Sequence, residues 1–200
     1  MVATVARWIR HEAEPTKGSR FIATVAPAAD EMAAREVLAA LREEMPDATH
    51  HCSAWRIASP SIDRASDDGE PSGSAGRPIL AQLQGRDLVN AVAIVTRYYG
   101  GTKLGVGGLV RAYGSAAGEA LEHAELVPFV PTMRLQIIHG YPEGADVERV
   151  LNEFDAVIVD AAYASDVRRA VEVPVDRLDA MTDALRDATR GRARVQRIET

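Results

Sequence analysis

The first part of the chain alternates short apolar segments with one amphipathic segment. Residues 21–25 and 51–57 contain β-branched or aromatic residues, with apolar residues at alternating positions, as is typical of strands. Between them, Asp30 is placed to cap a helix that Pro46 ends. The apolar residues of this helix recur on one face, which is formed by Ala34, Val37, Leu38, Leu41 and Met45. The pattern therefore predicts a strand, a helix and a second strand.

An uninterrupted apolar strand that leads into a glycine-rich turn is the most informative feature of this part. Residues 91–96 do not alternate, which indicates a strand buried on both faces. The turn 99–108 follows directly, and a helix is predicted from it to about His123. Upstream, residues 59–76 are rich in Ser, Asp, Gly and Pro and predict one long loop. A short helix is expected at 78–83, with proline in its first turn.

The last 70 residues show a regular alternation of strand and helix patterns. Residues 126–131 contain two prolines and predict a linker. Apolar residues alternate in 133–137 and recur at helical spacing in 147–154. Strands near 157–159, 167–175 and 194–198 and a helix capped by Asp176 complete the remaining elements. The order βαββαβ is the ferredoxin-like arrangement. We therefore expect an α+β chain with domains at 1–128 and 129–200.

The composition indicates the cellular compartment and limits the classes of ligand that the protein is expected to bind. The 200 residues contain one cysteine, so no internal disulfide is expected, in agreement with a reducing compartment. The start lacks the basic and apolar regions of a signal peptide, and no apolar run is long enough for a bilayer span. We expect a cytoplasmic protein without a membrane partner. The net charge of −6 argues against coating nucleic acid by bulk electrostatics, but leaves room for a local basic surface.

Two loops of the first domain carry the residue types of a binding site. Residues 67–76 include three carboxylates within four positions. Residues 97–113 hold five glycines and three cations, Arg97, Lys103 and Arg111, without an acidic residue. Exposed backbone N–H groups and the helix dipole favour an anion at such a turn. The predicted ligand is a phosphate, a carboxylate or the acidic loop itself.

Known phosphate motifs are absent, which leaves a structural alternative open. A P-loop needs Ser or Thr after its lysine, but Leu104 follows Lys103. A dinucleotide fingerprint that begins at Gly105 would need glycine or alanine at Val110. The glycines therefore have a second interpretation, in which they only permit a turn and close packing of helix on strand.

We expect the ligand-binding residues to come from both loops. They are Asp68, Glu70, Arg97, Tyr98, Tyr99, Gly100, Gly101, Lys103, Gly105, Gly107, Gly108 and Arg111. No catalytic residue is predicted by a motif, and only Asp68 and Glu70 are candidates for acid–base chemistry. Their alternative is a solvated turn or a salt bridge to Arg97 or Arg111. No cofactor is predicted. No metal site is predicted either, because His50 and Cys52 have no further ligand at metal-binding spacing, and because a solvated turn or a salt bridge is a commoner role for Asp67, Asp68 and Glu70 than binding Mg²⁺.

The two loops together resemble the signature of the IMPACT/YigZ family. The resemblance is carried by Asp68-Gly-Glu-Pro-Ser-Gly-Ser-Ala-Gly-Arg-Pro-Ile-Leu and by Thr96-Arg-Tyr-Tyr-Gly-Gly-Thr-Lys-Leu-Gly-Val-Gly-Gly-Leu-Val-Arg-Ala-Tyr. Ser19-Arg-Phe-Ile and His51-Cys-Ser-Ala-Trp-Arg-Ile fit the same pattern, and Tyr99 departs from it where phenylalanine is more usual. The resemblance implies a first domain like domain IV of elongation factor G, with a ribosomal-protein-like βαβ fold. It also implies a second domain like the small ferredoxin-like domain of bacterial members.

Function is expected to follow from binding rather than from chemistry. The resemblance also extends to eukaryotic members of the family, which regulate translation through a kinase pathway. Bacteria lack this pathway, so the regulatory role of the eukaryotic members is not carried over. The leading hypothesis is a non-catalytic protein that binds RNA or the ribosome in the regulation of translation. Two alternatives are an enzyme that acts on a small phosphorylated or carboxylated substrate in the cleft between the loops, and a module that binds a protein partner.

Overall fold

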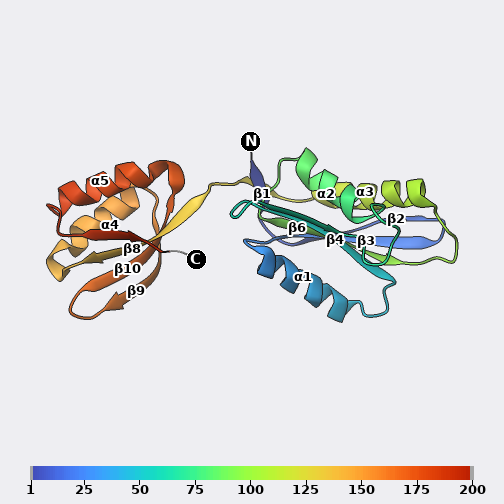
Figure 1. The fold of residues 1–200 in the computed structure, drawn as a ribbon, viewed down its shortest axis with the longest axis horizontal. Coiled ribbons are helices and arrows are strands. Elements are labelled where there is room, and N and C mark those ends of the chain that lie inside the picture. The colour runs from blue at the N-terminus through green and yellow to red at the C-terminus, as the bar shows by residue number, and fades with distance from the viewer. Residues whose placement is uncertain (1, 199–200) are drawn as a thin grey trace. The chain divides into compact units, whose positions relative to one another are not determined.

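The computed structural model describes residues 2–198 and divides the chain into two units, Met1–Phe129 and Val130–Thr200 (Figure 1). The elements of the first unit are β1 (Ala3–Val5), β2 (Ile9–Thr16), β3 (Ser19–Pro27), α1 (Glu31–Glu44), β4 (His50–Ile57), β5 (Ile62–Ser66), α2 (Gly76–Gly85), β6 (Ala91–Tyr98), α3 (Val106–Glu122) and β7 (Leu126–Pro128). No helix within residues 2–198 is long and apolar enough to cross a membrane.

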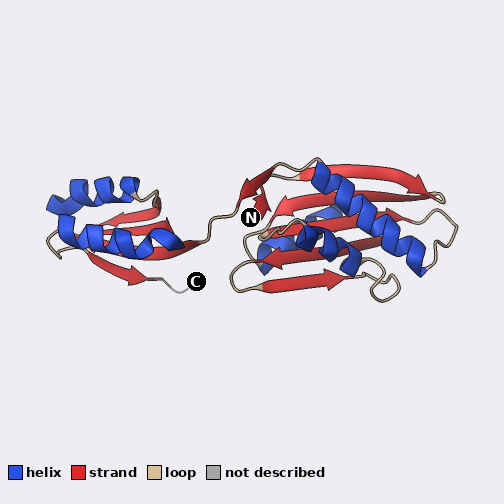
Figure 2. Cartoon of the chain, turned by 90° about the horizontal axis from the view of Figure 1, so that it is seen from above, coloured by secondary structure: helices blue, strands red, loops and turns tan. Residues whose placement is uncertain are grey.

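A five-stranded sheet forms the middle layer of the first unit. Its strand order is β2-β3-β6-β4-β5, and every neighbouring pair is antiparallel. Helix α1 covers one face, and α2 and α3 cover the other (Figure 1, Figure 2). Strand β6 lies in the centre of the sheet, between β3 and β4. The glycine-rich turn therefore starts at the end of the central strand and leads directly into α3.

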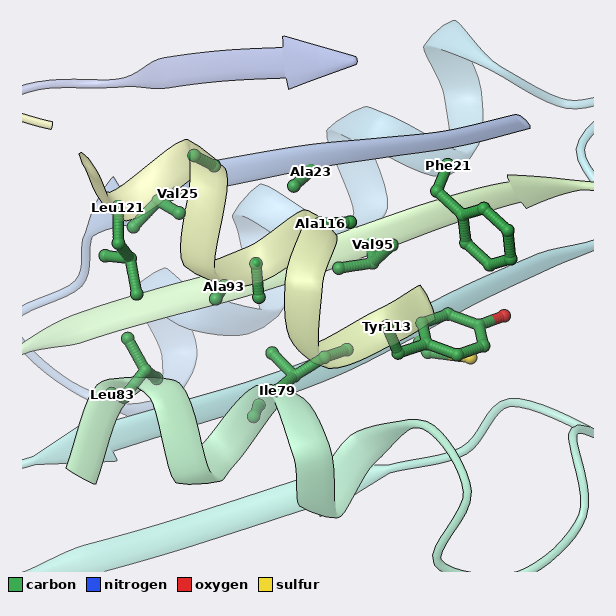
Figure 3. Packing of buried hydrophobic residues seen from close by; sticks show 14 of the residues in the cluster. Phe21, Ala23, Val25, Ile79, Leu83, Ala93, Val95, Tyr113, Ala116 and Leu121 are labelled. Atoms are coloured by element: carbon green, nitrogen blue, oxygen red, sulfur yellow. The ribbon is translucent and has the colours of Figure 1, made fainter. Parts of the chain in front are cut away.

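The buried apolar strand of the sequence separates two cores. Val92 and Ile94 of β6 point into the core beneath α1, whereas Ala93 and Val95 belong to the core beneath α2 and α3. Figure 3 shows the second core, in which Ala93 and Val95 lie among residues of β3, α2 and α3. Successive strand residues point to opposite faces, so a strand that is covered on both sides needs apolar residues at every position. The interpretation of residues 91–96 is confirmed.

Helix α1 begins where the sequence predicted. The Asp30 carboxylate accepts a hydrogen bond of 2.8 Å from the Ala33 backbone N–H, as a helix N-cap does. Ala34, Val37 and Leu41 are its buried residues, and the helix ends at Glu44, ahead of the proline.

One expectation about irregular segments was wrong, and the linker was right only in part, because the boundary between the two units at Phe129 and Val130 lies within it. The loop predicted for residues 59–76 contains a strand, β5, which pairs with β4 along its whole length. The linker predicted for residues 126–131 contains β7, which pairs with β1. Both strands are short, and β5 is largely exposed, so neither produces an apolar pattern of its own. Each is held by backbone hydrogen bonds to another strand: β5 pairs with the preceding strand β4, and β7 pairs with β1 at the start of the chain.

The second unit has the predicted ferredoxin-like topology. Its elements are β8 (Thr132–His139), α4 (Gly144–Glu153), β9 (Val157–Tyr163), β10 (Val167–Pro174), α5 (Leu178–Ala188) and β11 (Arg194–Arg197). The strand order β11-β8-β10-β9 is antiparallel throughout, and both helices pack on one core with the inward side chains of β8 and β10. Asp176 does not cap α5, because it lies in a 3-10 turn, Val175–Arg177, that precedes the helix.

Candidate functional site

The acidic loop, residues 67–76, folds around the carboxylate of Asp67. Its oxygens accept backbone N–H hydrogen bonds from Gly73 at 2.7 Å, Ala75 at 3.0 Å and Gly76 at 2.8 Å. Burial alone would raise the pKa of Asp67, but these three backbone donors outweigh it and hold the pKa below its ordinary value. Asp67 therefore has a structural role, because it fixes the path of the loop between β5 and α2.

We expect this closure to depend on pH. Because the pKa of Asp67 is lower in the folded chain, its stabilisation is complete above the ordinary value of 3.8 and is lost as the pH falls through the folded value. Asp67→Asn should cost about 1–3 kcal/mol of unfolding free energy at pH 7, since its neutral side chain cannot satisfy three donors. The cost should shrink toward pH 3 in urea titrations. Glu36→Gln, at an exposed position of α1, is the control and should show neither effect.

Asp68 faces away from the glycine-rich turn. Its carboxylate accepts a hydrogen bond of 2.6 Å from the backbone N–H of His51 and one of 2.7 Å from Arg42 on α1. These bonds tie the loop to the start of β4 and to α1. Within residues 2–198, the Asp68 carboxylate therefore has no hydrogen bond to another of the expected site residues.

Glu70 is the carboxylate that meets the glycine-rich segment. Its Oε1 accepts hydrogen bonds from Arg97 Nη1 at 2.5 Å and from the Tyr113 hydroxyl at 2.7 Å. The Glu70 and Arg97 side chains are only 4 % and 5 % exposed. Burial raises the pKa of Tyr113, whose hydroxyl remains a donor. This cluster joins the acidic loop, β6 and α3, so the two loops are neighbours in space through a buried ion pair.

The turn after β6 is packed against the turn between β2 and β3. The Ser19 hydroxyl accepts hydrogen bonds from Arg97 Nη2 and from the Gly100 backbone N–H, both at 3.1 Å. A Cβ atom at Gly100 would lie 1.9 Å from the carbonyl carbon of Gly18. Gly100 is therefore required by close backbone packing, which is the structural interpretation that the sequence left open for the glycines.

A cleft of about 320 Å³ opens where the acidic loop, the end of β6 and the start of α3 meet. It is lined by Glu70, Pro71, Arg97, Tyr99, Lys103, Leu104, Gly105, Val106 and Leu109. Gly105 precedes α3 with φ of 73°, makes no side-chain cap, and no acidic residue occupies the first helical turn. The first backbone N–H groups of α3 are thus left for solvent or a ligand.

A second hollow of about 380 Å³ lies on the other side of Leu104, against the β2–β3 hairpin. Arg111 and Lys17 line it together with Gly108, and so do the carboxylates of Glu14 and Glu119. Lys17, Lys103 and Arg111 are exposed, and none of their three side chains has a hydrogen bond or ion pair with another described residue. The start of α3 is therefore surrounded by free cations.

The remaining expected residues are divided between the cleft and its surroundings. Tyr98 packs beside the core beneath α1, and its hydroxyl donates to Asp47 at 3.3 Å, so it does not line the cleft. Tyr99, the next residue, does line it. Gly101 has φ of 82° and open space around it, and Gly107 has only the Arg111 guanidinium nearby.

Metal chemistry has no visible support at this site. Among residues 2–198, no group of three or more His, Cys, Asp or Glu side chains is arranged to hold a metal ion. His50 Nδ1 contacts the Asp68 carbonyl oxygen at 2.8 Å. Burial raises the pKa of the Cys52 thiol to about 12, and the thiol donates to the Asp67 carbonyl oxygen.

Sequence reasoning missed the apolar wall of the cleft and the supporting serine. Leu104, Val106 and Leu109 were assigned only to the turn and its helix, and Pro71 only to the loop. Ser19 was noticed as part of a family pattern and not as the partner of Arg97. An apolar exposed residue at the start of a helix, such as Val106, was the one available signal for the wall.

Fold and site together define a two-domain α+β protein whose first domain has an open cleft at the N-terminus of a helix. The model of the Impact N-terminal domain matches residues 17–121, and a domain of unknown function (DUF1949) matches residues 137–192. The chain belongs to the IMPACT family, as its resemblance indicated.

Several relatives extend over nearly the whole chain. It is 36 % identical over 189 residues to the IMPACT family member YigZ of Escherichia coli, covering 93 % of each protein. It is 42 % identical over 179 residues to an IMPACT family member of Thermus thermophilus, covering 89 % of this chain and 97 % of that one. A solved structure described as that of a hypothetical protein superposes with a TM-score of 0.75 at 35 % identity, over 98 % of this chain and 97 % of the other.

Proposed function

We propose that this protein is a non-catalytic, cytoplasmic RNA-binding protein that acts on the translation machinery. The observation that carries the proposal is the start of α3: an uncapped helix N-terminus in an open cleft, with Lys103 beside it and no carboxylate in the first turn. Phosphate groups suit such a place, because they accept backbone N–H bonds and are stabilised by the helix dipole.

The surrounding charges favour a polyanion over a single small anion. Lys17 and Arg111 lie in the neighbouring hollow, and both are free of partners within the described chain. Three unpaired cations around one helix terminus offer contacts for successive phosphates of a backbone. The chain carries a net charge of −6, and Glu14 and Glu119 also line the hollow, but residues 97–113 themselves contain no acid.

The carboxylates of the acidic loop support binding rather than catalysis. Glu70 is buried in hydrogen bonds to Arg97 and Tyr113, and Asp68 is engaged by Arg42 and the backbone of His51. A general base needs a free oxygen within reach of the substrate proton. Both oxygens of Asp68 and Oε1 of Glu70 are engaged by these donors, so an enzyme acting in this cleft has less support than a binding protein.

The salt dependence of RNA binding tests the proposal. For a single-stranded RNA oligonucleotide, the slope of log affinity against log salt should be shallower by about 1.4 in Lys103→Ala/Arg111→Ala, roughly 0.7 per lost phosphate contact. Fluorescence anisotropy over a salt series measures both slopes. Affinity at low salt should fall along with the slope.

A matched control separates the site from overall charge. Arg35→Ala/Arg64→Ala removes the same formal charge from exposed positions that both contact Glu31, on the side of α1. It should leave the slope unchanged. Equal slopes in wild type and in both double variants, or no binding at low salt, would reject the proposal. Co-sedimentation of the same variants with purified ribosomes extends the test to the assembled machinery.

A further inference from the structure

The cleft contains apolar groups that phosphate binding does not explain. Tyr99 and Val106 are 45 % and 58 % exposed, yet both line this cleft, together with Leu104 and Leu109. Phosphates and sugars are contacted by cations, hydroxyls and backbone N–H groups. A wall of aromatic and aliphatic side chains instead suits a flat apolar group.

Tyr99 is held by contacts to its ring and to its backbone. The guanidinium carbon of Arg97 lies over its ring, 5.3 Å from the ring centre. The Tyr99 backbone N–H donates to the Thr49 hydroxyl at 3.0 Å, which fixes the chain at the end of β6. Arg97 is itself fixed by Glu70 and Ser19. The ring therefore needs little ordering on binding, which favours a stacked ligand.

We infer that the cleft takes one unpaired nucleobase, stacked on Tyr99, while the adjoining phosphate lies at the start of α3. The inference rests on the proposed function and names its ligand class as single-stranded RNA. Bases stack on aromatic side chains in single strands, whereas the bases of a duplex are already stacked on each other. Arg97, over one face of the ring, adds a cation–π contact to the same site.

Substitutions at Tyr99 test the stack. Tyr99→Leu should weaken the binding of a short oligouridine by roughly tenfold, because stacking of one base is lost. Tyr99→Phe keeps the ring and should bind like wild type. Tyr163→Leu, at an exposed tyrosine of the second unit, is the control and should also bind like wild type. Equal affinity of Tyr99→Leu and wild type would overturn the inference.

The ligand can be varied in the same assay. An abasic oligomer keeps the phosphates of the oligouridine and removes its bases, and an RNA duplex of equal charge keeps its bases stacked. Both should bind wild type at least about tenfold more weakly than the single strand, and Tyr99→Leu should no longer distinguish the abasic oligomer from the oligouridine. A 2-aminopurine in the strand should be quenched by wild type and not by Tyr99→Leu.

The outcomes separate this inference from the proposed function. If abasic, duplex and single-stranded RNA bind equally, and all depend on Lys103 and Arg111, phosphate binding stands and the base site is wrong. If none of the three binds at low salt, both fail together. Preference for the single strand that disappears in Tyr99→Leu supports the base site.

Discussion

Glu70→Ala is expected to lower the unfolding free energy of the first unit by about 3–5 kcal/mol, a large part of the total stability of a small domain. The variant removes the counter-charge of Arg97, whose side chain is only 5 % exposed. The Tyr113 hydroxyl loses its acceptor at the same time. Among the described residues, Glu70 is the one carboxylate that forms an ion pair with Arg97, and Arg97 Nε has no hydrogen-bond partner. No other anion would therefore replace Glu70 in the variant.

Tryptophan fluorescence isolates the effect, because both tryptophans, Trp8 and Trp55, belong to the first unit. Urea unfolding of wild type and Glu70→Ala by this signal gives the difference. Glu12→Ala is the control: it breaks an exposed bidentate pair with Arg20 between β2 and β3 and should cost less than about 1 kcal/mol. A loss at Glu70 no larger than that at Glu12 would mean that the buried pair does not stabilise the fold.

The fold could be predicted wherever burial determines the spacing of apolar residues along a strand or helix. Residues 91–96 are covered on both faces, and 133–137 on one, so each segment shows the pattern of its own environment. Strand β5 could not be found in this way, because its side chains are mostly exposed and its existence depends on hydrogen bonds to β4. The short pair β1 and β7 likewise joins segments more than 100 residues apart.

The sequence could not predict the individual contacts of the residues in the two loops. Spacing along the chain could not distinguish Asp68 from Glu70, although one contacts α1 and the other is buried against Arg97. Tyr98 and Tyr99 were both expected to bind the ligand, yet only Tyr99 lines the cleft, whereas Tyr98 packs beside the core beneath α1. Arg111 was grouped with Lys103, yet it lines a hollow of its own. Such distinctions depend on the tertiary neighbours of each side chain.

Gly100→Ala should be the most disruptive glycine substitution in the chain. The added methyl carbon would lie 1.9 Å from the Gly18 carbonyl carbon, 2.2 Å from its oxygen and 2.3 Å from the Ser19 nitrogen. All three are backbone atoms, so relief requires the β2–β3 turn to move away from the turn after β6. That movement would also break the hydrogen bond from the Gly100 N–H to Ser19. We expect a loss of more than about 3 kcal/mol, at or beyond the usual upper end for overpacking.

Gly107→Ala is the matched comparison, and together the two variants separate the roles of the glycines. A methyl group at Gly107 meets only the Arg111 side chain, at 3.7 Å, and alanine favours a helix by up to about 1 kcal/mol over glycine. Gly107→Ala should therefore fold as well as wild type by tryptophan fluorescence. If it nevertheless binds RNA more weakly, the first turn of α3 contacts the ligand, and the glycine is needed for access to the backbone. If Gly100→Ala unfolds at the same urea concentration as Gly107→Ala, the close approach of the two turns is not a feature of the folded protein.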